Sequence, residues 1–238
     1  MPSPPLQQSA TRVGALPWHL ATALVGLVSL GIQLVLTIRG VNVLIDDATG
    51  RPAANTPTRV LRFFSYFTVE SNVIVIVTTL MLARDPERDG RWFRVGRIAG
   101  LIGIFVTFVV YLVALRPFLK LSGLAAVTDT GFHIVTPLLA VGGWVIFGPR
   151  PRFERSTLLW SLAWPGIYFV YSLIHGGITG WYPYPFVDVG KIGYPSALLN
   201  LALVAVLLLV VGTIFVWLDT RLKRTSNTVV GDSAHPFE

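Results

Sequence analysis

Six apolar runs, each about twenty residues long, restrict what this chain can fold into. They lie at residues 16–38, 60–83, 98–115, 126–147, 158–174 and 197–218. A helix of about 20 apolar residues crosses the hydrocarbon core of a bilayer, which is ~30 Å thick. The chain is only 13% charged, whereas soluble domains carry about 25% charged residues. The sequence therefore predicts an all-α, polytopic membrane protein with six transmembrane helices in one bundle.

The positions of the basic residues predict the orientation of these helices. Twelve of the 19 Lys and Arg residues precede the first run, follow the sixth, or lie in the second and fourth loops. Because cytoplasmic loops carry an excess of Lys and Arg, both termini are expected in the cytoplasm. Residues 1–15 are then a cytoplasmic segment, 16–218 the transmembrane domain, and 219–238 a disordered cytoplasmic tail. The net charge of +7 fits loops at an anionic bacterial inner membrane, and nucleic acid is not expected as a partner.

Polar side chains gather near the start of the second run. Thr68, Ser71 and Asn72 are spaced three and four residues apart, so they share one face of a helix. Glu70 points elsewhere on the same helix. A carboxylate at the centre of a spanning helix costs ~2.5–3.5 kcal/mol, so polar groups there often mark a functional site.

The fourth run carries a complementary group at a comparable depth. In the predicted orientation both runs enter from outside, with Thr68 and His133 each ~12 Å along their helices. A hydroxyl and an imidazole can then meet if the two helices are neighbours. Asp129 stands one turn before His133, and Pro137, which lacks an N–H, is expected to bend the helix beside it.

The fifth run and the loop after it supply further candidates. Tyr168 and His175 recur at helical spacing and are candidate substrate-binding residues. Trp181 opens an aromatic and proline-rich segment that either covers a site or anchors the chain at the headgroups. Packing alone is the alternative for Tyr168.

The residue types limit the chemistry. The chain has no cysteine, which excludes disulfides, thiolate metal sites and a cysteine nucleophile. Its histidines lack the spacing of metal ligands, so no metal or cofactor is expected. A threonine hydroxyl becomes a nucleophile when a neutral histidine within reach takes its proton. For a lipid that arrives from the bilayer, the natural reaction is acyl transfer or ester hydrolysis.

The oxyanion of such a reaction needs donors, for which Ser71 and Asn72 are candidates. Two alternatives stay open. Thr68 can simply bond to its own helix, as membrane-buried threonines commonly do. Alternatively, Glu70, Asp129 and His133 form a proton relay in a transporter or lipid-binding protein.

Short motifs give the chain a resemblance to a known family. Tyr66-Phe67-Thr68, Gly131-Phe132-His133 followed by Pro137, and Ile174-His175 followed by Trp181 and Tyr184-Pro185-Phe186 resemble the androgen-induced protein family. Its animal members are integral-membrane threonine hydrolases that cleave fatty acid esters of hydroxy fatty acids, and its bacterial relatives are six-pass membrane proteins. The resemblance implies Thr68 as the nucleophile and His133 as the base. The physiological lipid and the oligomeric state are left open.

Overall fold

The structure is a computed structural model that describes residues 5–41 and 54–222 of the chain. The α-helices are α1 (Pro5–Arg39), α2 (Thr56–Phe64), α3 (Phe67–Arg84), α4 (Arg91–Val110), α5 (Gly123–Thr130), α6 (Thr136–Phe147), α7 (Arg155–Thr179) and α8 (Val189–Arg221). A π-helical turn, Tyr111–Leu115, extends α4, and a second, Gly131–Val135, joins α5 to α6. Short 3-10 turns lie at Arg116–Phe118 and Pro185–Val187.

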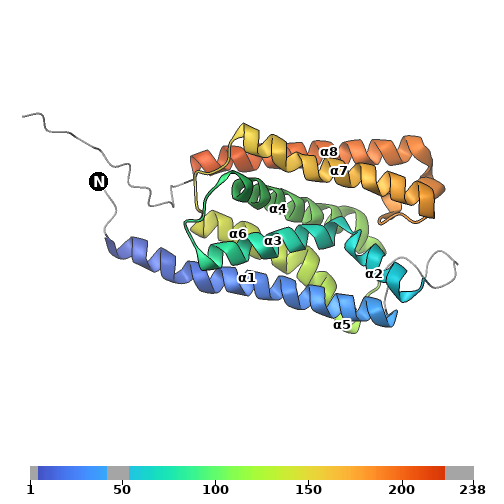
Figure 1. Ribbon diagram of the computed structural model, residues 1–238, viewed down its shortest axis with the longest axis horizontal. Helices are drawn as coiled ribbons and strands as arrows, with labels where there is room; N and C mark the ends of the chain where they lie inside the picture. Colours follow the sequence, from blue (N-terminus) through green and yellow to red (C-terminus); the bar gives the residue numbers. More distant parts are fainter. Residues whose placement is uncertain (1–4, 42–53, 223–238) are drawn as a thin grey trace, which may run out of the picture.

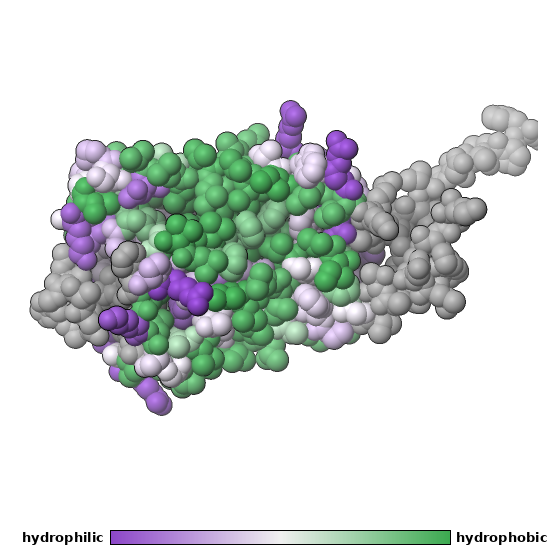
Figure 2. Space-filling view, turned by 180° about the vertical axis from the view of Figure 1, so that it is seen from behind, coloured by the Kyte–Doolittle hydropathy of each residue, from purple (hydrophilic) through white to green (hydrophobic). Residues whose placement is uncertain are grey.

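Six helical stretches of the described chain are long and apolar enough to cross a membrane, which confirms the predicted number. They are Gly14–Arg39, Phe67–Arg84, Arg91–Leu115, Gly123–Phe147, Arg155–Thr179 and Val189–Arg221. Hydrophobic residues cover the middle of the face in Figure 2, and hydrophilic residues gather toward its two ends. Helix α1 already begins at Pro5, inside the segment 1–15, and α8 continues to Arg221; the rest of the predicted tail, from 223, lies outside the described residues.

Helix α4 lies at the centre of the bundle, in contact with α3, α6, α7 and α8. Figure 1 shows α1 along one edge, α7 and α8 along the opposite edge, and α3, α4 and α6 between them. Leu101 and Ile104 of α4 are completely buried. Helix α1 packs against α3 and α6 and so joins the second and fourth spans on one side of the bundle.

The second apolar run is not one helix, which corrects the predicted span 60–83. Helix α2 ends at Phe64, Tyr66 is extended, and α3 starts at Phe67. In a continuous helix the Ser65 carbonyl would accept from the Val69 N–H. Here the Tyr168 hydroxyl donates to the Ser65 carbonyl (3.0 Å), and the Val69 N–H turns back to the Tyr66 carbonyl (2.9 Å). Thr68 therefore lies in the first turn of α3, and not eight residues inside a long helix.

Helix α2 is a short cap at the end of the bundle where α1 terminates. Asn55 begins it, because its side chain accepts from the Thr58 N–H at 3.0 Å. Arg59 then donates to the carbonyls of Thr37 (2.9 Å) and Ile38 (2.8 Å) in the last turn of α1. A guanidinium at a helix C-terminus satisfies carbonyls that have no intrahelical donor. This contact holds α2 across the end of α1.

Candidate functional site

The structure brings Thr68 and His133 together, as their paired chemistry predicts. Thr68 Oγ1 lies 3.3 Å from His133 Nε2. Both side chains are buried, with exposed fractions of 6% and 7%. The two residues are supplied by the first turn of α3 and by the π-helical turn between α5 and α6. A hydroxyl and an imidazole nitrogen at this distance can exchange a proton.

Asp129 orients the imidazole from its other side. His133 Nδ1 is hydrogen-bonded to the backbone carbonyl of Asp129 at 3.0 Å. The Asp129 carboxylate oxygen Oδ1 lies 3.0 Å from the same nitrogen but makes no hydrogen bond with any residue that the structure describes. The Tyr111 hydroxyl donates to the second carboxylate oxygen, Oδ2, at 2.5 Å. With its proton on Nδ1, His133 presents the Nε2 lone pair to the threonine hydroxyl. The side chains of Thr68, His133 and Asp129 thus place a hydroxyl, an imidazole and a carboxylate in a row.

The π-helical turn has a local cause that the sequence contains. Pro137 has no N–H for the carbonyl of His133, and the Thr136 N–H bonds to the Gly131 carbonyl, five residues back. The carbonyl of Phe132, which Thr136 would occupy in a regular α-helix, then accepts from Asn72 Nδ2 at 3.5 Å. The helix next to Pro137 is therefore irregular in the form of a π-helical turn; the bend itself stays a prediction.

Asn72 links α3 to the π-helical turn that contains His133. Its Nδ2 donates to the Thr68 carbonyl (2.8 Å) and to the Phe132 carbonyl. The amide therefore bridges the backbone of Thr68 and the residue next to His133. Ser71 Oγ lies on another side of α3, where a Cβ atom at Gly103 would be 2.9 Å away. Neither side chain lines the cavity in front of the pair, and their role as oxyanion donors stays a prediction.

Tyr184 completes the site, although sequence analysis did not select it. Its hydroxyl lies 3.3 Å from Thr68 Oγ1 and accepts from the Thr68 backbone N–H at 3.2 Å. That N–H has no intrahelical acceptor because it belongs to the first turn of α3. Removal from water raises the pKa of Tyr184 to about 12, so the phenol keeps its proton at neutral pH. The Tyr184-Pro185-Phe186 motif was the only signal for it in the sequence.

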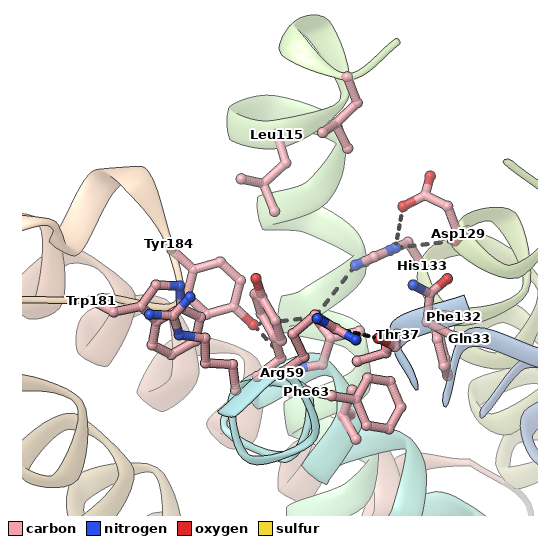
Figure 3. Close-up of a pocket in the computed structure, with 15 residues that line it drawn as sticks. Gln33, Thr37, Arg59, Phe63, Leu115, Asp129, Phe132, His133, Trp181 and Tyr184 are labelled. Atoms are coloured by element: carbon pink, nitrogen blue, oxygen red, sulfur yellow. Dashed lines mark hydrogen bonds and ion pairs between the residues drawn. The ribbon is translucent and has the colours of Figure 1, made fainter. Parts of the chain in front are cut away.

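A cavity with a volume of about 90 Å³ lies in front of the pair. Figure 3 shows His133 next to Asp129, with Tyr184 and Trp181 on the opposite side. Most of the remaining lining is apolar, including Phe63, Leu115, Leu119 and Phe132. Two arginines, Arg59 and Arg62, also line this cavity, and the Arg62 guanidinium lies over the Trp181 ring at 5.1 Å. The placement of Trp181 supports its prediction as a residue that covers a site.

The other predicted residues lie farther from Thr68 and His133. Tyr168 is buried and bonds to the Ser65 carbonyl, so it holds the break before α3. His175 packs against Tyr171 and Trp181 and does not line the cavity. Glu70 accepts from Trp164 Nε1 at 2.8 Å, on the side of α3 that faces α7. The three members of the alternative proton relay are therefore divided between two sides of α3.

The chain matches no protein-family model, no curated protein and no solved structure. The resemblance to the androgen-induced protein family therefore stays a prediction. Among the residues that the structure describes, no group of three or more His, Cys, Asp or Glu side chains converges as metal ligands would. What the site offers is a hydroxyl, an imidazole, a carboxylate and a phenol around an apolar cavity.

Proposed function

We propose that this protein is an intramembrane hydrolase of lipid esters, with Thr68 as the nucleophile and His133 as the general base. The observation that carries the proposal is the chain of contacts from Thr68 Oγ1 to His133 Nε2 (3.3 Å) and from His133 Nδ1 to Asp129 (3.0 Å). A hydroxyl, an imidazole and a carboxylate in this order form the arrangement that activates an alcohol nucleophile in unrelated hydrolases.

The reaction proceeds in two balanced steps. Thr68 Oγ1 attacks the ester carbonyl and gives its proton to His133 Nε2. The bond to the alcohol oxygen then breaks, the alcohol leaves with that proton, and the acyl group stays on Thr68. Water next attacks the acyl group and transfers a proton to His133, which returns it to Thr68 as the fatty acid leaves. The sum is one ester and one water converted to one acid and one alcohol.

The tetrahedral intermediate carries a negative oxygen that needs nearby donors. Tyr184 supplies a phenol O–H within 3.3 Å of Thr68 Oγ1. The N-terminus of α3 adds the positive end of a helix dipole, because Thr68 is in its first turn. These groups, rather than Ser71, are the donors that we assign.

The lining of the first cavity suits an ester substrate that has an apolar chain and an anionic group. Its lining is mostly apolar, which suits a lipid. Arg59 and Arg62 add two positive charges at the same cavity. Fatty acid esters of hydroxy fatty acids, the substrates that the resemblance implies, carry a free carboxylate on the alcohol portion. In the predicted orientation, with both termini cytoplasmic, the site opens toward the outer half of the membrane and the substrate enters from the bilayer.

The direct test is hydrolysis of a long-chain chromogenic ester by purified protein in nanodiscs. We expect Thr68→Ala and His133→Ala each to lower kcat/KM by about 10³-fold or more, because each removes one member of a cooperating pair. Thr78→Ala is the matched control. Thr78 is buried in the same helix, and its hydroxyl bonds only within α3, to the carbonyls of Ile74 (2.9 Å) and Val75 (3.3 Å).

The control should retain turnover within about threefold, since its hydroxyl serves its own helix. Thr68→Ser keeps a hydroxyl at the site and should retain part of the activity. Undiminished turnover in Thr68→Ala or His133→Ala would contradict the assignment. Equal losses in Thr68→Ala and Thr78→Ala, with equal losses of folded protein, would assign Thr68 a structural role.

A further inference from the structure

A second cavity, with a volume of about 50 Å³, lies on the other side of Thr68. It is enclosed by α4, α7, α8 and the start of α3. Its lining is apolar apart from a few hydroxyl groups and includes Phe67, Val106, Val110, Phe169, Leu201 and Val204. No charged side chain lines it, in contrast to the first cavity with its arginines, aspartate and histidine.

The two cavities meet at the proposed nucleophile. Thr68, Leu115 and Tyr184 are the residues that line both of them. An ester has two arms, the acyl chain and the alcohol portion, which diverge from the carbonyl carbon. A carbonyl carbon placed at Thr68 Oγ1 therefore has one space for each arm.

The position of the base decides which arm lies in which cavity. His133 must return its proton to the oxygen of the leaving alcohol, so that oxygen has to lie on the His133 side of Thr68. His133 lines the first cavity and not the second. The acyl group, which stays on Thr68 after the first step, is then directed away from His133. The apolar lining of the second cavity suits a hydrocarbon chain that carries no charge.

We infer that the second cavity binds the part of the acyl chain next to the ester carbonyl, and that its size restricts the acyl chains that the protein accepts. This inference rests on the proposed hydrolase function. The alcohol portion, with any anionic group it bears, occupies the first cavity beside Arg59 and Arg62. Val204 of α8 lines the second cavity only, and it is the residue that is changed in the test below.

The test measures kcat/KM on 4-nitrophenyl esters with acyl chains from two to sixteen carbons, in nanodiscs. Val204→Phe fills the cavity and should shift the preferred chain toward shorter acids, with a loss of at least tenfold on the longest esters. Val204→Ala enlarges the cavity and should shift the preference the opposite way. Val206→Phe is the matched control, because Val206 lies on the same helix and is 58% exposed on the outer surface; its chain-length profile should equal that of the wild type.

The outcomes separate this inference from the function on which it rests. If the wild type cleaves the esters and Thr68→Ala does not, the hydrolase stands; unchanged length profiles in both Val204 variants would then overturn the acyl-chain assignment. Should Val204→Phe fail to fold, Val204→Ala still decides, because its predicted shift has the opposite sign.

If no ester is cleaved, the hydrolase proposal is wrong. Binding of radiolabelled decanoic acid to Thr68→Ala protein then tests whether the second cavity binds an acyl chain. Saturable binding that Val204→Phe abolishes and Val206→Phe preserves would support an acyl-chain site without hydrolysis. Equal binding by the two phenylalanine variants, or no saturable binding, would overturn it.

Discussion

The ring of Tyr111 stacks on the imidazole of His133, with centroids 4.3 Å apart and planes inclined by 12°. The hydroxyl of the same tyrosine donates a hydrogen bond to Asp129 Oδ2, so one residue contacts both the imidazole and the carboxylate beside it. Tyr111 begins one π-helical turn and His133 lies in the other. Such turns widen a helix locally and are frequent at functional sites. Here they bring an aromatic face and an imidazole together between two spans.

Two substitutions separate the role of the carboxylate from that of the Tyr111 hydroxyl. Asp129→Asn keeps the shape of the side chain but removes the charge that stabilises an imidazolium, so kcat should fall by about 10²–10⁴-fold. Tyr111→Phe keeps the ring and removes only the hydroxyl, so the loss in kcat should be about tenfold or less. Steady-state kinetics on the chromogenic ester measures both.

The prediction depends on which of the two variants loses more kcat. A larger loss in Tyr111→Phe than in Asp129→Asn would indicate that the tyrosine hydroxyl, and not the carboxylate, acts on His133. Thermal unfolding in the same nanodiscs is the control, since Asp129 is buried and its replacement also changes stability.

Tyr184→Phe tests the phenol as a donor to the oxyanion. Loss of one such donor typically costs about 10²–10³-fold in kcat, and we expect a loss in this range with KM nearly unchanged. Phe132→Leu, a change in the same cavity that removes no donor, is the control and should alter KM more than kcat. A Tyr184→Phe variant that raises KM at constant kcat would show that Tyr184 binds the ground state and the transition state equally.

The same tyrosine predicts a dependence of stability on alkaline pH. Burial raises the pKa of Tyr184 to about 12, whereas an unfolded tyrosine has a pKa of about 10. The folded state therefore holds this proton more tightly, and its contribution to stability is full below pH ~10 and is lost as the pH rises toward 12. The unfolding temperature of the wild type should thus fall more steeply over this pH window than that of Tyr184→Phe. Parallel curves would show that the phenol titrates alike in both states.

The sequence was sufficient to predict the parts of the site that depend on residue type. The equal depth predicted for Thr68 and His133 was wrong, because Thr68 is the second residue of α3 whereas His133 lies well inside the span Gly123–Phe147. Apolar runs of about twenty residues fix the number of spans, because the bilayer thickness sets the helix length. The hydroxyl of Thr68 and the imidazole of His133 were selected as a chemically complementary pair, and the structure places them 3.3 Å apart. Pro137 indicated an irregular helix around His133, because a missing N–H acts locally, and the structure has a π-helical turn there.

The break before Thr68 could not be predicted, because its cause is a tertiary contact. Residues 60–83 contain no proline or glycine, so the pattern favours one continuous helix. The break depends on the Tyr168 hydroxyl, which comes from a helix about 100 residues later and takes the Ser65 carbonyl. Tyr184 was missed for a similar reason. It belongs to a loop, and only the folding of that loop over α3 brings its hydroxyl to Thr68.

Glu70→Gln distinguishes the hydrolase from the proton relay. The Glu70 carboxylate bonds to Trp164 on α7 and lines neither cavity, so we expect ester hydrolysis within about threefold of the wild type. The glutamine side-chain oxygen can still accept from Trp164 Nε1, and folding should be retained. Proton-coupled uptake into liposomes that disappears in Glu70→Gln, with no ester hydrolysis by the wild type, would instead favour the transporter.

Helix α7 and the loop that follows it are in close contact at Gly176. Helix α7 ends at Gly180, whose backbone is left-handed (φ 68°), and the chain turns back so that the Tyr182 ring lies over Gly176. A Cβ atom at Gly176 would lie 2.0 Å from that ring. Gly176→Ala must therefore displace the Tyr182 ring, and we expect this to shift the loop in which Tyr182 lies between Trp181 and Tyr184.

We expect Gly176→Ala to lower kcat by about tenfold through the displaced Tyr184 hydroxyl and to reduce stability by about 1–3 kcal/mol through overpacking. Gly177→Ala is the matched control, because a Cβ there meets no atom within 4 Å. That variant should keep full activity and gain up to about 1 kcal/mol, since alanine favours a helix over glycine. Kinetics and thermal unfolding of the two variants side by side test the prediction, and equal behaviour would show that the loop does not rest on Gly176.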